Sequence, residues 1–168
     1  MPLPVRTGRD NRPIEELTQL ITLLAAGLFA GGALYASVAE HPGRVAAGTE
    51  VAVSQFPHSY ERAVPLQGAL AITALTFGVV AAFVSGSWEW GLAGGCVGAA
   101  VPITLVMIAP VNERLMSRSR RLSDAEAVTL LATWGRLHSL RTGLGVAGFT
   151  GLRARCRVVR PGLRLRGR

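Results

Sequence analysis

The sequence predicts an all-α fold, a four-helix transmembrane bundle that is antiparallel up-down with a short interfacial segment between helices 1 and 2. Two observations carry this prediction. Residues 17–39, 63–88 and 90–112 contain no charged side chain, and a helix of about 20 apolar residues crosses the hydrocarbon core. A fourth apolar stretch, residues 128–152, is interrupted by a histidine and two arginines. We therefore expect helices near 17–39, 65–87, 90–111 and 128–152.

The composition argues against a soluble or nucleic-acid-binding protein. The 168 residues suit one domain, 49% of them are hydrophobic, and the net charge of +8 comes from arginine alone among the basic residues. These arginines gather at the termini and in one loop, with no basic groove interleaved with aromatic residues. The expected partner is thus the lipid bilayer, with no nucleic acid. We divide the chain into a basic N-terminal arm (1–16), a membrane domain (17–152) and a disordered, arginine-rich cytoplasmic tail (153–168).

The first helix contains glycines that allow close contact with a neighbouring helix. A cleaved signal peptide is the alternative interpretation, because residues 36–39 resemble a cleavage site. The retained helix is favoured, since acidic residues stand where a signal has a basic region. We expect it to end at Glu40-His41-Pro42-Gly43, where proline and glycine stop a helix. Residues 43–64 are then too polar to span and are expected to carry the interfacial segment.

Short signals separate the remaining helices. Trp88-Glu89-Trp90 predicts a turn with both tryptophans at the membrane interface. Pro102 is expected to kink the third helix, and Pro110-Val111-Asn112 to close it. Ser123-Asp124-Ala125-Glu126 resembles a capping box that starts the fourth helix.

The orientation follows from counting arginines. The N-terminal arm and the tail hold ten, whereas the two loops on the opposite side hold six, including Arg44 and Arg62. Because basic residues favour the cytoplasm, both termini are expected inside, most simply in a bacterial plasma membrane.

One polar stripe interrupts the fourth helix. Trp134, His138 and Arg141 recur at i, i+4 and i+7, so they share one helical face, which glycines 145 and 148 continue. Arg136 points the opposite way. Ionisable side chains inside a span usually face the bundle interior and mark function. The alternative is that the arginines reach lipid headgroups and the histidine sits at the interface.

An up-down topology brings other polar residues to the same mouth of the bundle. Glu40 and His41 end helix 1, Tyr60 and Arg62 precede helix 2, and Asn112 and Glu113 end helix 3. Such convergence is typical of a small-molecule pocket. The plainer alternatives are that His41 and Asn112 cap helix ends, Tyr60 anchors at the interface and Arg62 sets topology. His41 and His138 with Glu40 or Glu113 are the possible metal ligands, but no pair among them has the helical spacing of bundle metal sites, so no metal is predicted. We assign no role to Cys96 or Cys156.

Several segments together resemble the anthrone oxygenase-like family of small four-helix membrane proteins. The likeness covers roughly residues 17–150. The segments that carry it are Gly27-Leu28-Phe29-Ala30-Gly31-Gly32 with Glu40-His41-Pro42, then Ser59-Tyr60-Glu61-Arg62-Ala63, then Pro102-Ile103-Thr104 with Pro110-Val111-Asn112-Glu113-Arg114-Leu115, and finally Trp134-Gly135-Arg136-Leu137-His138-Ser139-Leu140-Arg141-Thr142. The resemblance implies oxidation of anthrones to anthraquinones by molecular oxygen.

The function we expect is thus a cofactor-independent oxygenase acting on a small aromatic substrate, with oxygen as co-substrate. His138 is the candidate base, because its unperturbed pKa lies near neutrality. Asn112 and Arg141 are expected to hold the developing oxyanion, and His41 to act as a second donor or proton shuttle. The residues expected to bind the substrate, by stacking in the case of the tryptophan, are Trp134 and Tyr60. The alternative is a non-catalytic membrane protein, either a partner subunit or a small-molecule carrier.

Overall fold

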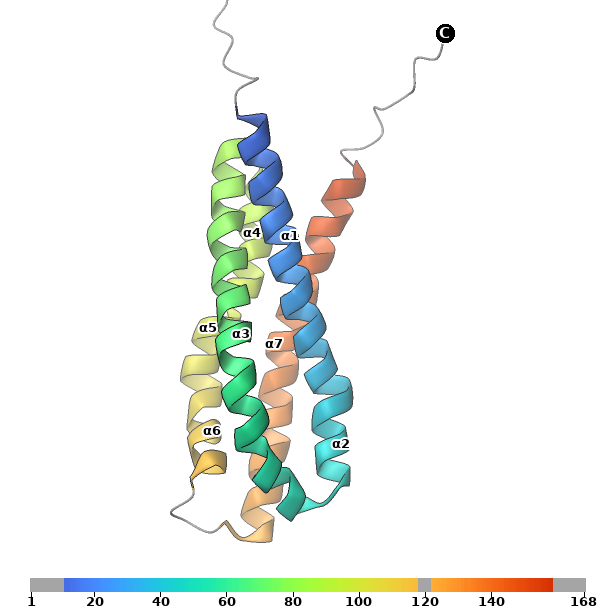
Figure 1. The fold of residues 1–168 in the computed structure, drawn as a ribbon, viewed down its shortest axis with the longest axis vertical. Helices are drawn as coiled ribbons and strands as arrows, with labels where there is room; N and C mark the ends of the chain where they lie inside the picture. The colour runs from blue at the N-terminus through green and yellow to red at the C-terminus, as the bar shows by residue number, and fades with distance from the viewer. Residues whose placement is uncertain (1–10, 118–121, 159–168) are drawn as a thin grey trace, which may run out of the picture.

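Four long helical segments pack side by side in the computed structural model, which describes residues 11–117 and 122–158, the last six by their backbone alone (Figure 1). The prediction of an all-α fold is confirmed. The first segment joins α1 (Arg12–Tyr35), η1 (Ala36–Glu40) and α2 (His41–Ala46), and the second is α3 (Thr49–Ser85). The third joins α4 (Trp88–Gly98), α5 (Ala100–Ile103), η2 (Thr104–Ile108) and α6 (Ala109–Met116), and the fourth is α7 (Asp124–Val158).

The length of the helices and their outward-facing apolar side chains are typical of a membrane protein. In the described part of the chain, three helical segments are long and apolar enough to cross a membrane: Arg12–Ala46, Thr49–Ser85 and Trp88–Met116. The fourth, α7, is not among them. Large apolar side chains point outward, such as Phe83 at 85% exposed, while the core is built largely from alanine. Lipid accepts the large side chains, and small residues let helices approach closely.

Residues from distant parts of the sequence meet where the segments contact one another. Gly27 of α1 lies against Phe149 near the end of α7, whereas His41 of α2 lies against Gly135, much earlier in α7. Gln67 of α3 likewise meets Gly32 on α1. Figure 1 shows the start of α1 and the end of α7 at the same end of the bundle.

Glycines allow α3 and α4 to touch backbone to backbone. A Cβ added at Gly78 would lie 2.8 Å from the oxygen of Trp90, and one at Gly94 would lie 2.5 Å from the oxygen of Ala74. A backbone oxygen, unlike the end of a flexible side chain, cannot move aside to make room for the added atom. Gly78 and Gly94 therefore provide the close packing of these two helices.

We expect Gly94→Ala to lower the free energy of unfolding by about 1–3 kcal/mol, because overpacking forces the backbones apart. Gly95→Ala is the matched control. Nothing lies within 4 Å of a Cβ added at Gly95, so alanine there should be neutral or stabilise the helix by up to about 1 kcal/mol. Unfolding in mixed detergent micelles measures both. Equal stability of the two variants would contradict this helix contact.

The predicted end of the first helix at Glu40–Gly43 is wrong. The chain widens into a π-helical turn, in which the His41 N–H bonds to the oxygen of Ala36, and continues as α2 to Ala46. A second π-helical turn stands directly before Pro110. A proline ring clashes with the carbonyl four residues earlier, and a widened turn avoids that clash without ending the helix. The break comes instead at Gly48, whose φ is 104°.

The expected interfacial segment is not a separate element. Residues 49–64 form the first part of α3, which continues through Pro57 and Pro65. Phe56 is fully buried in a cluster with Ile108 and Trp134, so this part of α3 is held by contacts with η2 and α7. Tertiary packing thus overrides the local polarity of the stretch.

Other element ends also differ from the sequence predictions. The turn before α4 is formed by Gly86, with a φ of 68°, and the third segment continues past Asn112 to Met116. Trp88 is 69% exposed, but Trp90 is buried at 4% and anchors the bundle core instead of the interface.

The observed ends of the membrane domain also differ from the predicted ones. The helix of α1 begins at Arg12, inside the predicted arm, and α7 continues to Val158, inside the predicted tail. Residues 1–10 and 159–168 lie outside the described residues. The start of α7 agrees with prediction, because the Glu126 N–H donates to Ser123 Oγ at 3.3 Å. The Glu126 carboxylate does not close the capping box but pairs with Arg114.

Candidate functional site

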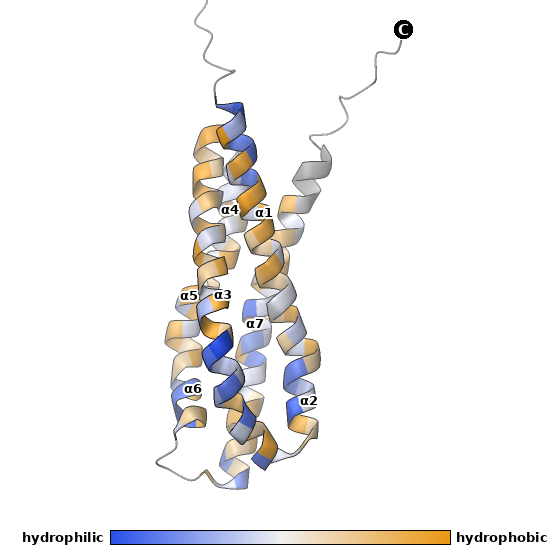
Figure 2. Ribbon diagram, viewed as in Figure 1, coloured by the Kyte–Doolittle hydropathy of each residue, from blue (hydrophilic) through white to orange (hydrophobic). Residues whose placement is uncertain are grey.

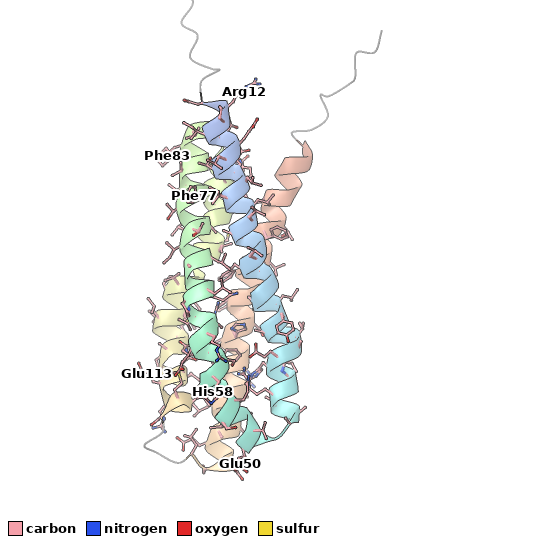
Figure 3. All side chains as sticks on the ribbon, viewed as in Figure 1. Arg12, Glu50, His58, Phe77, Phe83 and Glu113 are labelled. Atoms are coloured by element: carbon pink, nitrogen blue, oxygen red, sulfur yellow. The ribbon has the colours of Figure 1, made fainter. Side chains whose placement is uncertain are left out.

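A cavity of about 220 Å³ lies between the helical segments, and all four contribute to its lining. Figure 2 shows hydrophilic residues gathered in the same half of the bundle, along α2, the first part of α3 and the middle of α7. Figure 3 places this half toward the end marked by Glu50 and Glu113, away from Arg12 and Phe83. The polar lining side chains are Glu40, Arg44, Ser59, Tyr60, Gln67, Thr104, Trp134, His138 and Arg141.

The polar stripe of α7 lines this cavity as its spacing predicts. Trp134, His138 and Arg141 all belong to the wall, whereas Arg136 is exposed on the opposite face. The rings of Trp134 and His138 stack, with centroids 4.5 Å apart and planes 11° from parallel. The stacking fixes the plane of the imidazole.

His138 is buried and its tautomer follows from its partner. Its Nε2 lies 3.3 Å from the backbone oxygen of Ala33. A carbonyl oxygen only accepts hydrogen bonds, so Nε2 carries the proton of the neutral ring and Nδ1 keeps a lone pair. That Nδ1 is buried and has no hydrogen-bond partner among the described residues. The ring of this cavity-lining residue therefore carries an unused proton acceptor.

Arg141 reaches across the cavity to α3. Its Nη2 donates to Gln67 Oε1 at 3.0 Å, and its guanidinium lies over the Phe29 ring, 5.2 Å from the centroid. Gly32 leaves the space that the amide of Gln67 occupies. The glycines that continue the stripe meet α1 and α4, since added Cβ atoms at Gly145 and Gly148 would clash with Phe29 and the Ala93 oxygen.

Tyr60 and Asn112 form a second polar pair. Asn112 Nδ2 donates to Tyr60 Oη at 2.8 Å. Tyr60 lines the cavity, and Asn112 lies behind it, buried at 2% exposure. Asn112 sits inside α6 and Tyr60 inside α3, so the first is not a helix cap. A tyrosine oxygen that accepts a hydrogen bond becomes a better donor through its own O–H.

His41 is near the site but does not line the cavity. Its ring packs against Trp134, with centroids 4.9 Å apart, and its Nε2 side lies over Gly135. Trp134 thus has His41 and His138 as ring neighbours. The structure brings His41 to the same level as His138 and places it behind the tryptophan.

Sequence reasoning missed several residues of the wall, including two that bond to other lining residues. Arg44, counted as a loop charge, is buried at 8% exposure and bonds to Glu40 at 2.5 Å and to Ser59 at 2.7 Å. Its guanidinium also lies 5.2 Å from the Phe56 ring centroid. Gln67 carried a readable signal: it follows Tyr60 by seven residues, the same spacing that joins Trp134 to Arg141. Arg44 carried none, because its loop was expected to be solvated.

The lining has the chemistry of a binding site for an organic molecule. Aromatic side chains, one buried ion pair and several unused donors surround the cavity. In the described residues no three His, Cys, Asp or Glu side chains are grouped to hold a metal. Buried polar atoms without partners are uncommon and need an explanation. Around this cavity they include Arg44 Nε, Trp134 Nε1, His138 Nδ1 and Arg141 Nε.

Comparison with known proteins gives one match. No curated protein and no solved structure matches the chain. The family model described as anthrone oxygenase matches residues 56–151. The matched stretch begins at Phe56 in the cavity wall and ends within α7, so it includes Tyr60, Gln67, His138 and Arg141. Because the match covers more than half of the chain, this protein belongs to the anthrone oxygenase family.

Proposed function

We propose that the protein is a membrane-embedded oxygenase that oxidises an anthrone-like aromatic compound with molecular oxygen, without a cofactor. The observation that carries the proposal is the buried Nδ1 of His138, a proton acceptor with no partner among the described residues. An anthrone suits such an acceptor, because it has an acidic CH₂ between two rings. Its carbanion is electron-rich enough to react with oxygen directly.

In the proposed reaction, His138 Nδ1 removes one proton from the CH₂ group. The carbanion forms a carbon–oxygen bond with O₂, and the resulting peroxide takes up a proton. Loss of the second proton from the same carbon breaks the O–O bond and leaves a carbonyl group and water. One O₂ is thereby reduced by the four electrons that convert CH₂ to C=O. The two protons that leave the carbon need an acceptor, and the peroxide and the departing hydroxide each need a donor; His138 is assigned both roles.

Charge develops on the ketone oxygen when the carbanion forms. Arg141 and the Tyr60 hydroxyl, polarised by Asn112, are the proposed donors to that oxygen. Donors fixed by their own hydrogen bonds need no reorganisation during the reaction, and both groups are fixed in this way. Asn112 thus acts through Tyr60.

The aromatic walls suit a planar substrate. Trp134 and Phe56 line the cavity, and their rings meet edge to face at 5.5 Å. A second cavity of about 120 Å³ shares Val64, Gln67, Thr104 and Arg141 with the first. Together the two spaces reach the lower end of the range of small-molecule pockets, about 300–1,000 Å³. In this proposal His41 supports the tryptophan from behind.

Oxygen uptake tests the proposed function. Purified protein supplied with an anthrone should consume one O₂ for each anthraquinone formed, faster than heat-denatured protein at the same concentration. Release of hydrogen peroxide in place of water would contradict the reaction as written. A rate no greater than that of the denatured control would remove the enzymatic proposal and favour a carrier or partner subunit, for which the polar network would set helix register.

For the membrane arrangement we propose that α7 is the fourth span and that both termini are cytoplasmic, in a bacterial plasma membrane. With Arg44 buried, the opposite side keeps five arginines against ten near the termini. A reporter at the C-terminus should then give a cytoplasmic signal, and one inserted at Gly48 an exterior signal. Both reporters on one side would contradict an even number of spans.

A further inference from the structure

The charges around the cavity do not balance. Glu40 is the carboxylate in the wall, and it pairs with Arg44 at 2.5 Å. The other ion pair in the described residues, Arg114–Glu126, is not part of the cavity lining. Arg141 therefore has no carboxylate partner in that part of the chain. The lining carries one net positive charge, located on Arg141.

The neighbours of Arg141 satisfy its guanidinium only in part. The guanidinium donates to the neutral oxygen of Gln67 on α3 and lies over the ring of Phe29 on α1. Tyr60 and Thr104 line the same cavity, and both carry uncharged hydroxyls. The Arg141 Nε is buried without a hydrogen-bond partner among the described residues. A cation removed from water is costly unless it is paired, so this site favours an anion.

We propose that the cavity binds aromatic compounds that are already anionic at neutral pH, through a carboxylate or ionised phenol placed on Arg141. This charge belongs to the resting ligand and is distinct from the oxyanion formed during turnover. The inference names the substrate class of the proposed oxygenase and rests on that proposal. Arg141 and His138 are three residues apart, about 4.5 Å along the helix axis. The acidic group and the reactive carbon of one planar ligand can therefore meet the two residues together.

Two probes of nearly equal shape test the charge preference. Anthraquinone-2-carboxylate and anthraquinone-2-carboxamide differ in charge, and neither requires turnover. Calorimetry on the full-length protein in nanodiscs of zwitterionic lipid should give tighter binding of the carboxylate. Arg141→Gln should weaken the carboxylate about 10- to 100-fold, the range for a hydrogen bond to a charged group, and the carboxamide by less than about threefold.

Gln67→Glu is the second variant, chosen because it keeps Arg141. The new carboxylate would stand where Gln67 Oε1 now lies, 3.0 Å from Nη2, and would compete with the ligand anion. We expect the same selective loss of carboxylate binding in a protein that still folds. Arg136→Gln, which removes an exposed arginine of the same helix, should change neither affinity.

Equal weakening of both probes by Arg141→Gln, or unchanged carboxylate binding in Gln67→Glu, would overturn the proposal. A lipid headgroup is the other source of an anion. Displacement of the carboxylate probe by a short-chain phosphatidylglycerol would assign Arg141 to lipid and overturn the proposal as well. Because binding is measured without turnover, a selective carboxylate site combined with no oxygen uptake would reject the oxygenase function alone.

Discussion

His138→Gln is expected to lower the rate of anthrone oxidation about 10²- to 10⁴-fold, the usual value of a positioned base. The glutamine amide can still donate to the oxygen of Ala33, which the ring now contacts at 3.3 Å. It offers no basic nitrogen in place of Nδ1. The variant therefore removes the proton acceptor and keeps the buried hydrogen bond. Oxygen uptake per folded molecule measures the effect, with the folded fraction taken from gel filtration and circular dichroism.

His58→Gln is the matched control, because His58 is exposed and lies outside the cavity lining (Figure 3). It should leave the rate unchanged. If His138 is only structural, His138→Gln should cost about 1 kcal/mol of stability, and activity should fall only with the amount of folded protein. Normal activity per folded molecule would falsify the assignment of His138 as the base and favour the non-catalytic alternative.

Glu40→Gln is expected to give the largest loss of stability, about 3 kcal/mol in the free energy of unfolding. Removing one partner of a buried ion pair leaves the other charge uncompensated, which typically costs about 3–5 kcal/mol. The Arg44 side chain is 4% exposed and Glu40 is 30% exposed, so we expect the lower end of that range. Denaturation in mixed micelles measures the change.

Glu126→Gln provides the comparison within the same chain. Its carboxylate is also 30% exposed, but its partner Arg114 is 43% exposed. Exposed ion pairs contribute about 0–1 kcal/mol, so this variant should lose no more than that. Equal losses in the two variants would mean that Arg44 is hydrated in the membrane-bound protein. A double change of Glu40 and Arg44 to glutamine and methionine should recover part of the loss, because no lone buried charge remains.

Patterns within single helices were enough to predict the all-α class and the inner face of α7. The uncharged stretches are as long as membrane-spanning helices. The spacing of Trp134, His138 and Arg141 places them on one helical face, independently of the neighbouring helices. The same spacing would have placed Gln67 on the face of Tyr60 in α3, although the sequence prediction did not include it. Such conclusions depend on periodicity within one helix, so they need no knowledge of the other helices.

Where helices end was decided by the tertiary structure. Pro42 and Pro110 are local stop signals, but π-helical turns before them let both helices continue. Each such turn adds one residue and so rotates everything that follows about the helix axis. The contacts of Phe56 with Trp134 and Ile108 then favour a continuous α3 over a solvated segment. Local sequence carries no record of these contacts.

Packing between the helices also sets how each helix is rotated about its own axis. An up-down topology would place His41, Arg44 and Trp134 at one level, but it would leave open which of them faces the cavity. In the folded bundle Arg44 turns inward against Glu40 and Ser59, while His41 packs behind Trp134 over Gly135. Trp90 likewise turns into the core. The physical reason is that a helix presents its side chains in a fixed order around its axis, whereas the face that is buried depends on the fit of all four segments together.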